Sequence, residues 1–151
     1  MTKSVSPDKF QKELKQMFGN LERRSEEDLN ESIETGLKFG VKMWRKKAEE
    51  KGWGSGDSGH KYHKHGKSYH TGRYIRSIRS HMTSKGETPS GEIGAPKMPG
   101  LAHLLEFGHA SPGGGSVRPK VHVAPAADVT FEYTQGDIEK RIEITLKEFG
   151  G

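Results

Sequence analysis

The sequence predicts an α+β fold, with a small antiparallel sheet flanked by a long N-terminal helix and a C-terminal helix. Apolar residues recur at helical spacing over residues 10–48 and again over 126–149. Between these stretches, short segments of strand-like composition are separated by Gly and Pro, which typically mark turns. The length of 151 residues fits one domain, so we expect residues 1–151 to form a single unit.

The composition favours a protein that binds other subunits. Only 30% of the residues are hydrophobic and 30% are charged, which is lean for a self-sufficient core. The lack of cysteine excludes disulfides, thiolate catalysis and Cys-based zinc sites. No run approaches the roughly 18 apolar residues that span a bilayer, and the N-terminus has no signal-type apolar run. We therefore expect a soluble protein that is made in the cytoplasm and has no membrane partner.

The charge permits several partners. A formal net charge of +5 and a pI near 9.4 allow attraction to nucleic acid or to an acidic protein. Basic and acidic residues are interspersed along the predicted helices rather than segregated. The charge alone therefore identifies no partner.

The first helix is expected to begin with Ser6 as its N-cap and Pro7 as its first residue. Its apolar stripe has two parts that are out of register with each other. They consist of Phe10, Leu14, Met17 and Leu21, and of Leu29, Ile33, Leu37, Val41, Trp44 and Ala48. One long helix with a twisted buried face and two helices hinged at residues 19–24 both fit this pattern. The stripes would pack on the fold or on a neighbouring subunit, with a membrane-surface helix as the minor alternative.

Residues 52–70 predict a flexible loop. The first part is rich in Gly, which loses the most backbone entropy when it is ordered. The second part is basic, aromatic and rich in His. Loops of this length are usually functional or disordered, so we expect this one to become ordered at an interface.

The middle of the chain predicts a short turn followed by a hairpin. Tyr74, Ile75 and Ile78 can share one face of the turn, which leads into a strand at about 79–84. Lys85-Gly86 is a plausible hairpin turn, and a returning strand is expected at about 88–95. Pro96 and Pro99 then end that strand.

A short helix at 101–107 is expected next, with Leu101, Leu104 and Leu105 on its buried side and Gly108 as its C-cap. Residues 110–116 contain consecutive glycines and predict a second flexible loop. Val117, Val121 and Val123 then suggest a strand, and its alternation would leave Lys120 and His122 facing outward.

The last element is expected to be a helix at 126–149 with a kink at Gln135-Gly136. Its predicted inward face consists of Val129, Tyr133, Ile138, Ile142, Thr145, Leu146 and Phe149.

The histidines are the first candidates for chemistry. His60, His63, His65 and His70 lie at short spacings that can suit zinc, copper or nickel. Lys61, Lys64 and Lys67 lie among them, and their charges oppose cation binding. We favour a solvated, partner-contacting loop over a metal site. Contacts of this basic segment, with Tyr62 and Tyr69, to phosphates and bases stay open as an alternative.

A second group comprises His103, Glu106 and His109, spaced at three residues. A general-base or metal role lacks a nucleophile partner, and a carboxylate in a tight turn usually pairs locally. No phosphate-binding loop, nucleophile elbow or zinc-protease motif occurs in the sequence. We therefore expect a protein that is not an enzyme, with no catalytic residue, metal ligand or cofactor.

Three segments together resemble a known family. They are TGRYIRSI at 71–78, PGLAHLLEFG at 99–108 and VRPKVHVAPAA at 117–127. Their order, between a long charged helix and a final helix, is similar to that of siphovirus-type tail-completion or head-to-tail joining proteins. These proteins of tailed bacteriophages are also called minor capsid or neck proteins.

The resemblance implies a structural virion protein of a tailed phage or prophage. Its implied partners are head-tail connector, tail terminator or tail tube proteins, and copies of itself in a ring. It implies a location at the virion neck or tail end, and in the host cytoplasm during assembly. The motif residues that it implies to be structural are Thr71, Gly72, Arg73, Ser77, Ile78, Leu104, Glu106, Phe107, Gly108, Arg118, Pro119, Pro125 and Ala126.

The same resemblance implies a structural turn at Glu106-Phe107-Gly108, in which the carboxylate holds a backbone or an arginine. We expect Leu104, Leu105 and Phe107 to form the apolar core of this turn.

The alternative function is a small basic nucleic-acid-binding protein. It would use the Lys/His/Tyr segment together with Arg73, Arg76 and Arg79, which a helix would place along one edge. Any contact with DNA is expected to be non-specific.

Overall fold

The computed structural model describes residues 6–52, 61–64, 67–70 and 72–150, and confirms an α+β fold. The helices are α1 (Pro7–Glu50), α2 (Gly72–Ser77), α3 (Pro99–Phe107) and α4 (Val123–Gly150). The strands are β1 (Lys61–Lys64), β2 (Lys67–His70), β3 (Arg79–Ser84), β4 (Ser90–Gly94), β5 (His109–Ala110) and β6 (Ser116–Val117). They pair as three antiparallel hairpins, β1–β2, β3–β4 and β5–β6, rather than as one sheet.

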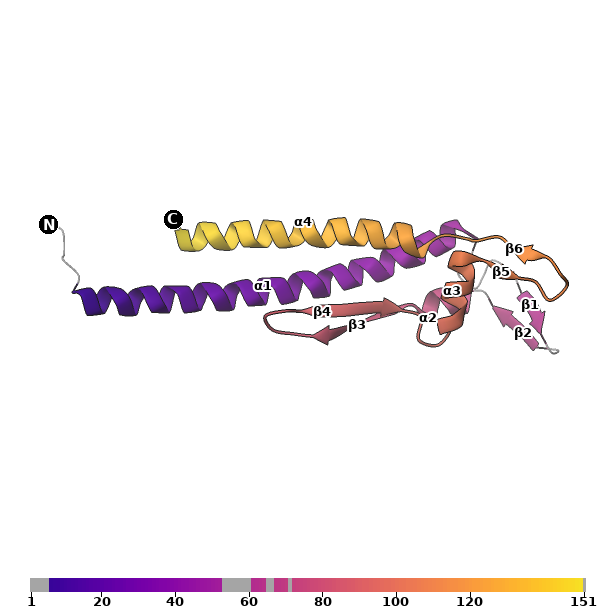
Figure 1. Cartoon of the computed structure of the whole chain (residues 1–151), viewed down its shortest axis with the longest axis horizontal. Helices are drawn as coiled ribbons and strands as arrows, with labels where there is room; N and C mark the ends of the chain where they lie inside the picture. Colours follow the sequence, from indigo (N-terminus) through magenta and orange to yellow (C-terminus); the bar gives the residue numbers. More distant parts are fainter. Residues whose placement is uncertain (1–5, 53–60, 65–66, 71, 151) are drawn as a thin grey trace.

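The molecule is elongated, and the two long helices set its axis. Figure 1 shows α4 running antiparallel beside α1, with the β3–β4 hairpin along another side of α1. The short elements α2, α3 and β5–β6 gather at the end where α1 finishes and α4 begins. The motif segments of the sequence therefore lie at one end of the molecule.

Helix α1 is one continuous helix of 44 residues, so the alternative of a hinge at residues 19–24 is wrong. Its start is as expected, because the Ser6 side chain accepts a hydrogen bond from the Lys9 backbone N–H at 3.4 Å. Arg24 pairs one turn on with Glu27 at 3.8 Å and with Asp28 at 3.7 Å, across the break in the apolar stripe. Such pairs support helix where no apolar residue does.

Small and polar residues form the contact between α1 and α4. The buried residues of α1 recur every fourth position, and they are Asp28, Ser32, Gly36, Gly40, Trp44 and Ala48. A Cβ atom at Gly36 would collide with the Thr134 side chain, and one at Gly40 would lie 2.8 Å from Thr130 Cγ2. The two glycines therefore let α4 approach α1 closely.

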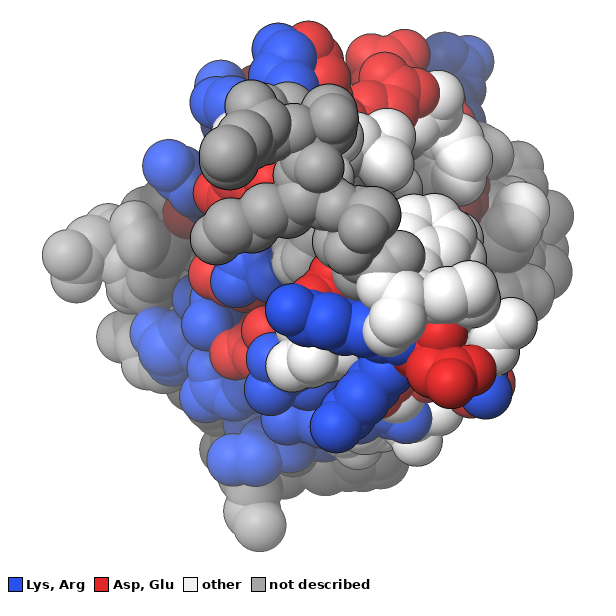
Figure 2. Space-filling view, turned by 90° about the vertical axis from the view of Figure 1, so that its left-hand side faces the viewer, with Lys and Arg blue, Asp and Glu red and all other residues white. Residues whose placement is uncertain are grey.

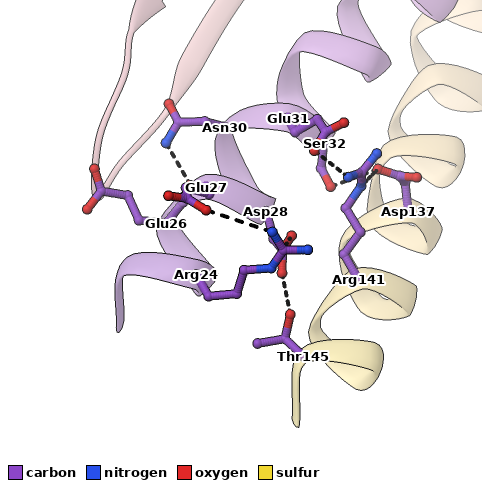
Figure 3. Close-up of polar contacts among 10 residues, drawn as sticks. All are labelled: Arg24, Glu26, Glu27, Asp28, Asn30, Glu31, Ser32, Asp137, Arg141 and Thr145. Carbon is purple, nitrogen blue, oxygen red and sulfur yellow. Dashed lines mark hydrogen bonds and ion pairs between the residues drawn. The ribbon is translucent and has the colours of Figure 1, made fainter. Parts of the chain in front are cut away.

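Polar bonds continue this contact toward the C-terminal end of α4 (Figure 3). Ser32 donates to Asp137 at 2.8 Å, and the Arg141 Nε atom donates to the same carboxylate at 2.7 Å. Arg141 also pairs with Glu31 at 2.7 Å, and Thr145 donates to the buried Asp28. We call these α1–α4 contacts, from Asp28 to Gly40, the helix seam.

Helix α4 differs from its expectation in three ways. It begins at Val123, earlier than predicted, and it runs without a break through Gln135-Gly136, so the predicted kink is wrong. The Gln135 side chain donates to Glu139 at 2.9 Å and bridges the glycine. The predicted inward face is wrong in part, because Leu146 is 55% exposed and Tyr133 lies at the edge, stacked on Phe39.

The β3–β4 hairpin matches the sequence closely. The first strand has the expected bounds and the second is shorter than expected, with a register shift between Met82 and Ser84. Its turn contains Gly86, with a φ of 108° that favours glycine. The Asn30 side chain donates to the Gly86 carbonyl at 2.9 Å and accepts from its N–H at 3.0 Å. The turn is thereby fixed to α1.

A small apolar core fills the end where the short elements meet. It contains Trp44, Ala48, Tyr74, Ile75, Ile78, Ala95, Leu105 and Ala126. The predicted common face of Tyr74, Ile75 and Ile78 is confirmed, since all three are buried.

Both predicted loops contain paired backbone. Within 52–70, the described backbone pairs as β1–β2, and around 110–116 it pairs as β5–β6. The flexibility of both loops stays a prediction. The expected strand through Val117, Val121 and Val123 is wrong, because β6 ends at Val117 and Val123 already belongs to α4.

We expect Gly36→Leu to lower the free energy of unfolding by about 1–3 kcal/mol, because a larger side chain in a tight helix contact forces the helices apart. Gly19→Leu in the same helix is the matched control. Nothing lies within 4 Å of a Cβ atom at Gly19, so higher helix propensity should leave it neutral or up to about 1 kcal/mol more stable. Urea unfolding of both variants measures the difference, and equal effects would contradict the close approach.

Candidate functional site

The motif segments meet at Glu106, near the end of α3. Its carboxylate accepts backbone hydrogen bonds from His122 at 2.8 Å, Val123 at 2.9 Å and Ala124 at 3.0 Å. These N–H groups belong to the start of α4, where no carbonyl of a preceding helical turn is available to accept their hydrogen bonds. Glu106 therefore caps α4 from another helix, and the expectation that this carboxylate holds a backbone is confirmed.

Electrostatics favour the charged form of this cap. Burial of Glu106 raises its pKa, but the hydrogen bonds from the three N–H groups and the nearby His122 ring outweigh burial, so the pKa lies below its ordinary value. The partial positive charge at the N-terminus of α4 acts in the same direction.

A buried chain of polar side chains lies beside the cap. Trp44 donates from Nε1 to the Tyr74 hydroxyl at 3.1 Å, and that hydroxyl lies 2.8 Å from His122 Nε2. His122 Nδ1 lies 2.7 Å from the Lys120 carbonyl, which can only accept, so Nδ1 carries a proton. Burial raises the pKa of Tyr74 to about 12, so its hydroxyl stays protonated. The chain thus links α1, α2 and the start of α4.

His122 is the residue that sequence patterns placed wrongly. It was expected to face outward from a strand, but its side chain is fully buried. The segment from Lys120 to His122 is not a strand, because it closes the gap between α3 and α4, and the Lys120 N–H donates to the Leu105 carbonyl at 2.7 Å. Pro125 is the signal that could have revealed this, since Pro is typical of the first turn of a helix.

Gly108 joins the second and third motif segments. Its φ of 74° favours glycine, and a Cβ atom there would lie 2.5 Å from the Val117 carbonyl and 3.1 Å from Pro119. The expected role of Gly108 as the residue that closes α3 is confirmed.

The remaining motif residues divide between the core and the surface. Gly72, Ser77, Ile78 and Ala126 are buried, Pro125 is half-buried, Arg73, Arg118 and Pro119 are exposed, and Thr71 lies outside the described residues.

The expected apolar core of the turn is wrong for two of its three residues. Leu105 is buried, but Leu104 is 41% exposed and Phe107 is 68% exposed. A helix as short as α3 turns only one narrow side inward, and Leu105 and Glu106 occupy it. Phe107 lies against the exposed His103 ring, with ring centroids 4.8 Å apart.

The predicted group of His103, Glu106 and His109 is not brought together. Glu106 is turned toward α4, while His103 and His109 are exposed. On the described backbone of β1 and β2, His63 pairs with Ser68 and His70 with Lys61, while His60 and His65 lie outside the described residues. Across residues 6–52 and 72–150, no group of three or more His, Asp or Glu side chains could hold a metal ion.

The predicted basic edge is also divided. Arg73 and Arg76 are exposed on α2, but Arg79 belongs to β3. The helix ends at Ser77, whose hydroxyl bonds to the Tyr74 carbonyl at 2.6 Å. Only two of the three arginines therefore share a helix.

An open apolar groove lies between α4 and β4, with α1 as its floor. It has a volume of about 710 Å³. Its apolar lining includes Ile33, Leu37, Ile93, Val123, Phe131 and Ile138. Phe131 is 71% exposed on one wall. No sequence pattern predicts this groove, because its floor and its two walls come from segments that are distant in the sequence.

Comparison with protein-family models, with curated proteins and with solved structures found no match. None of the helices in the described part of the chain is long and apolar enough to cross a membrane.

We expect Glu106→Ala to lower the free energy of unfolding by about 3 kcal/mol or more. Three hydrogen bonds to a charged group are lost, and each contributes about 1.5–3 kcal/mol. The loss should shrink on acidification, because a carboxylate with a lowered folded pKa stabilises the fold fully above its ordinary value of 4.5 and loses this effect as the pH falls through the folded pKa.

Urea unfolding of wild type and variant at several pH values between about 3 and about 7 measures both effects. The exposed Glu87 provides the control, and Glu87→Ala should change stability by less than about 0.5 kcal/mol. A difference between wild type and Glu106→Ala that stays constant with pH would contradict the role of the charged cap.

Proposed function

We propose that this chain is a structural virion protein of a tailed phage or prophage, which acts at the head-tail joint or tail end through contacts with other proteins. The observation that carries the proposal is the junction at Glu106. Segments that resemble the joining-protein family, and that are separate in the sequence, contribute to one buried cluster there. This is the behaviour expected of a motif set that specifies a fold rather than a reaction.

The surface of the junction supports protein binding. Leu104 and Phe107 project from α3, and Val117 and Val121, which follow in the next motif segment, are 43% and 44% exposed. We call these four residues the α3 surface. Exposed apolar side chains of this kind mark interaction sites when they gather. The proposed partners at this surface are the head-tail connector, tail terminator or tail tube proteins. Copies of the chain, which would form a ring, are proposed as further partners.

Such a role needs no catalytic group, metal or cofactor, because joining preformed assemblies is a matter of complementary surfaces. The proposed location is the virion neck or tail end, after assembly in the host cytoplasm.

A basic surface keeps nucleic-acid binding as a second candidate function. Figure 2, viewed from the end of the molecule that carries the start of α1, shows Lys and Arg gathered on one side, with Asp and Glu interspersed among them. The exposed Arg73 and Arg76 add positive charge on α2. Attraction of this kind is sequence-independent and sensitive to salt.

We expect Leu104→Ala and Phe107→Ala to abolish joining of heads to tails while leaving thermal melting nearly unchanged, because both side chains are exposed. Leu105→Ala should instead unfold or strongly destabilise the protein, since truncation of a buried Leu costs about 2–5 kcal/mol. His103→Ala and His109→Ala are the controls and should preserve both properties. The measurements are melting of the purified proteins and the yield of infectious particles when each variant complements a gene deletion.

Normal particle yield from Leu104→Ala and Phe107→Ala would contradict the α3 surface. Loss of yield only in the histidine variants, with normal melting, would instead point to a chemical role for His103 and His109.

We expect binding to random DNA to be weak and to disappear near physiological salt, because acidic residues lie among the basic ones. Fluorescence anisotropy with duplex and single-stranded DNA at increasing salt measures this. Tight binding that persists at physiological salt would favour the nucleic-acid function over the virion function.

A further inference from the structure

The first part of α1 extends beyond the rest of the fold. The end of α4 lies beside α1 at Asn20 to Glu27, where Glu148 and Phe149 share a shallow pocket with these residues. Figure 1 shows α1 continuing past the end of α4 and past the tip of the β3–β4 hairpin. We call residues 7–21 the arm.

The arm carries an apolar stripe that faces solvent. Its apolar residues fall on one side of the helix at 100° per residue, and they are Phe10, Leu14, Met17, Phe18 and Leu21. Phe10 is 58% exposed and Phe18 is 57% exposed. A single helix in water is marginal without a packed apolar face, so the stripe is suited to an interface.

The groove between α4 and β4 is the complementary feature. Its floor is α1 and its walls are α4 and β4. A further helix that lies along the groove would therefore pack on Leu37, Ile93 and Phe131 together. A cavity of about 710 Å³ has room for several large apolar side chains.

The arm cannot reach the groove of its own chain. Helix α1 is continuous, so the centre of the arm at Leu14 lies about 35 Å along the axis from Leu37 in the floor of the groove. Any arm in this groove must come from a second copy.

Charge favours the same pairing. The outer edge of the groove on α4 carries Asp128, Glu132 and Glu139, all exposed and spaced along one side of the helix. Lys9 and Lys15 lie on either side of the apolar stripe of the arm, and Glu13, which pairs with Lys9 at 3.9 Å, lies on the same side as Lys9. The arm as a whole carries Lys9, Lys12 and Lys15 against Asp8 and Glu13, so its small positive charge suits the acidic edge.

We infer that the arm of one copy docks in the groove of a second copy, with the apolar stripe on the groove floor. Reciprocal exchange closes a dimer, and sequential exchange closes a ring. This contact would join the copies of the chain in the proposed ring. It rests on the proposed function only in its assumption that copies of the chain bind one another. Its test uses the purified protein alone, so its failure is distinguishable from a failure to join virions.

The experiment measures the mass of the full chain by sedimentation and light scattering over a range of concentrations. The wild type is expected to self-associate. An arm variant with Phe10→Ser and Phe18→Ser, and a groove variant with Phe131→Glu, should each associate about ten- to hundred-fold more weakly, as expected when large apolar side chains leave an interface. Phe107→Ser, exposed at the far end of the molecule, is the matched control and should associate like the wild type.

Mixing the two variants is the decisive measurement. The arm variant keeps an intact groove and the groove variant keeps an intact arm, so an equimolar mixture should form heterodimers through one restored contact. Circular dichroism confirms that each variant is folded. Ala127→Glu, at another exposed position in the groove lining, replaces Phe131→Glu if that variant unfolds.

A monomeric wild type, variants that associate like the wild type, or a mixture that does not restore association would each overturn the inference. Association that only the Phe107→Ser variant loses would also overturn it, because the interface would then lie at the α3 surface.

Discussion

The hydrogen bonds from the start of α4 to the Glu106 carboxylate fix the arrangement of the whole chain. Helix α4 has 28 residues but lacks a Ser, Thr, Asp or Asn immediately before it. The cap comes from α3, so the position of α3 decides where α4 begins and which way it points. From this cap α4 runs antiparallel along α1. The cap also holds His122 within hydrogen-bond distance of Tyr74, which in turn accepts a hydrogen bond from Trp44.

The parts of the fold that the sequence predicted are those with local causes. The Ser6-Pro7 start, the strand after Ile78 and the turn at Gly86 each depend on residues that are neighbours in sequence. The buried position of His122 depends instead on another element, because nothing beside His122 in the sequence shows that a carboxylate from α3 caps the next helix. The continuity of α4 at Gly136 has a local cause, the hydrogen bond between Gln135 and Glu139, but a glycine pattern alone does not reveal it. Glu106 was found from the motif that contains it, but the groove was not, because it exists only where three separate elements meet.

The helix seam explains why a chain with few apolar residues exposes so many of them. Close approach at Gly36 and Gly40 requires small side chains, and polar pairs such as Ser32 with Asp137 complete the contact. Large apolar side chains therefore have no place in the seam, and Phe131, Leu146 and the stripe of the arm remain at the surface. A fold built in this way has apolar surface available for assembly while its own helices are held mainly by shape and hydrogen bonds.

The seam also has a consequence for the order of folding. It joins Asp28 to Thr145, residues that are 117 positions apart in the sequence, whereas the β3–β4 hairpin and the cap of α4 join residues close together. Contacts between distant residues form late, because the chain between them must first be brought together. During synthesis the glycine face of α1 therefore leaves the ribosome long before its partner helix exists. The β3–β4 hairpin, which is hydrogen-bonded to α1 at Asn30, is synthesised before α4 and can therefore pack on α1 first.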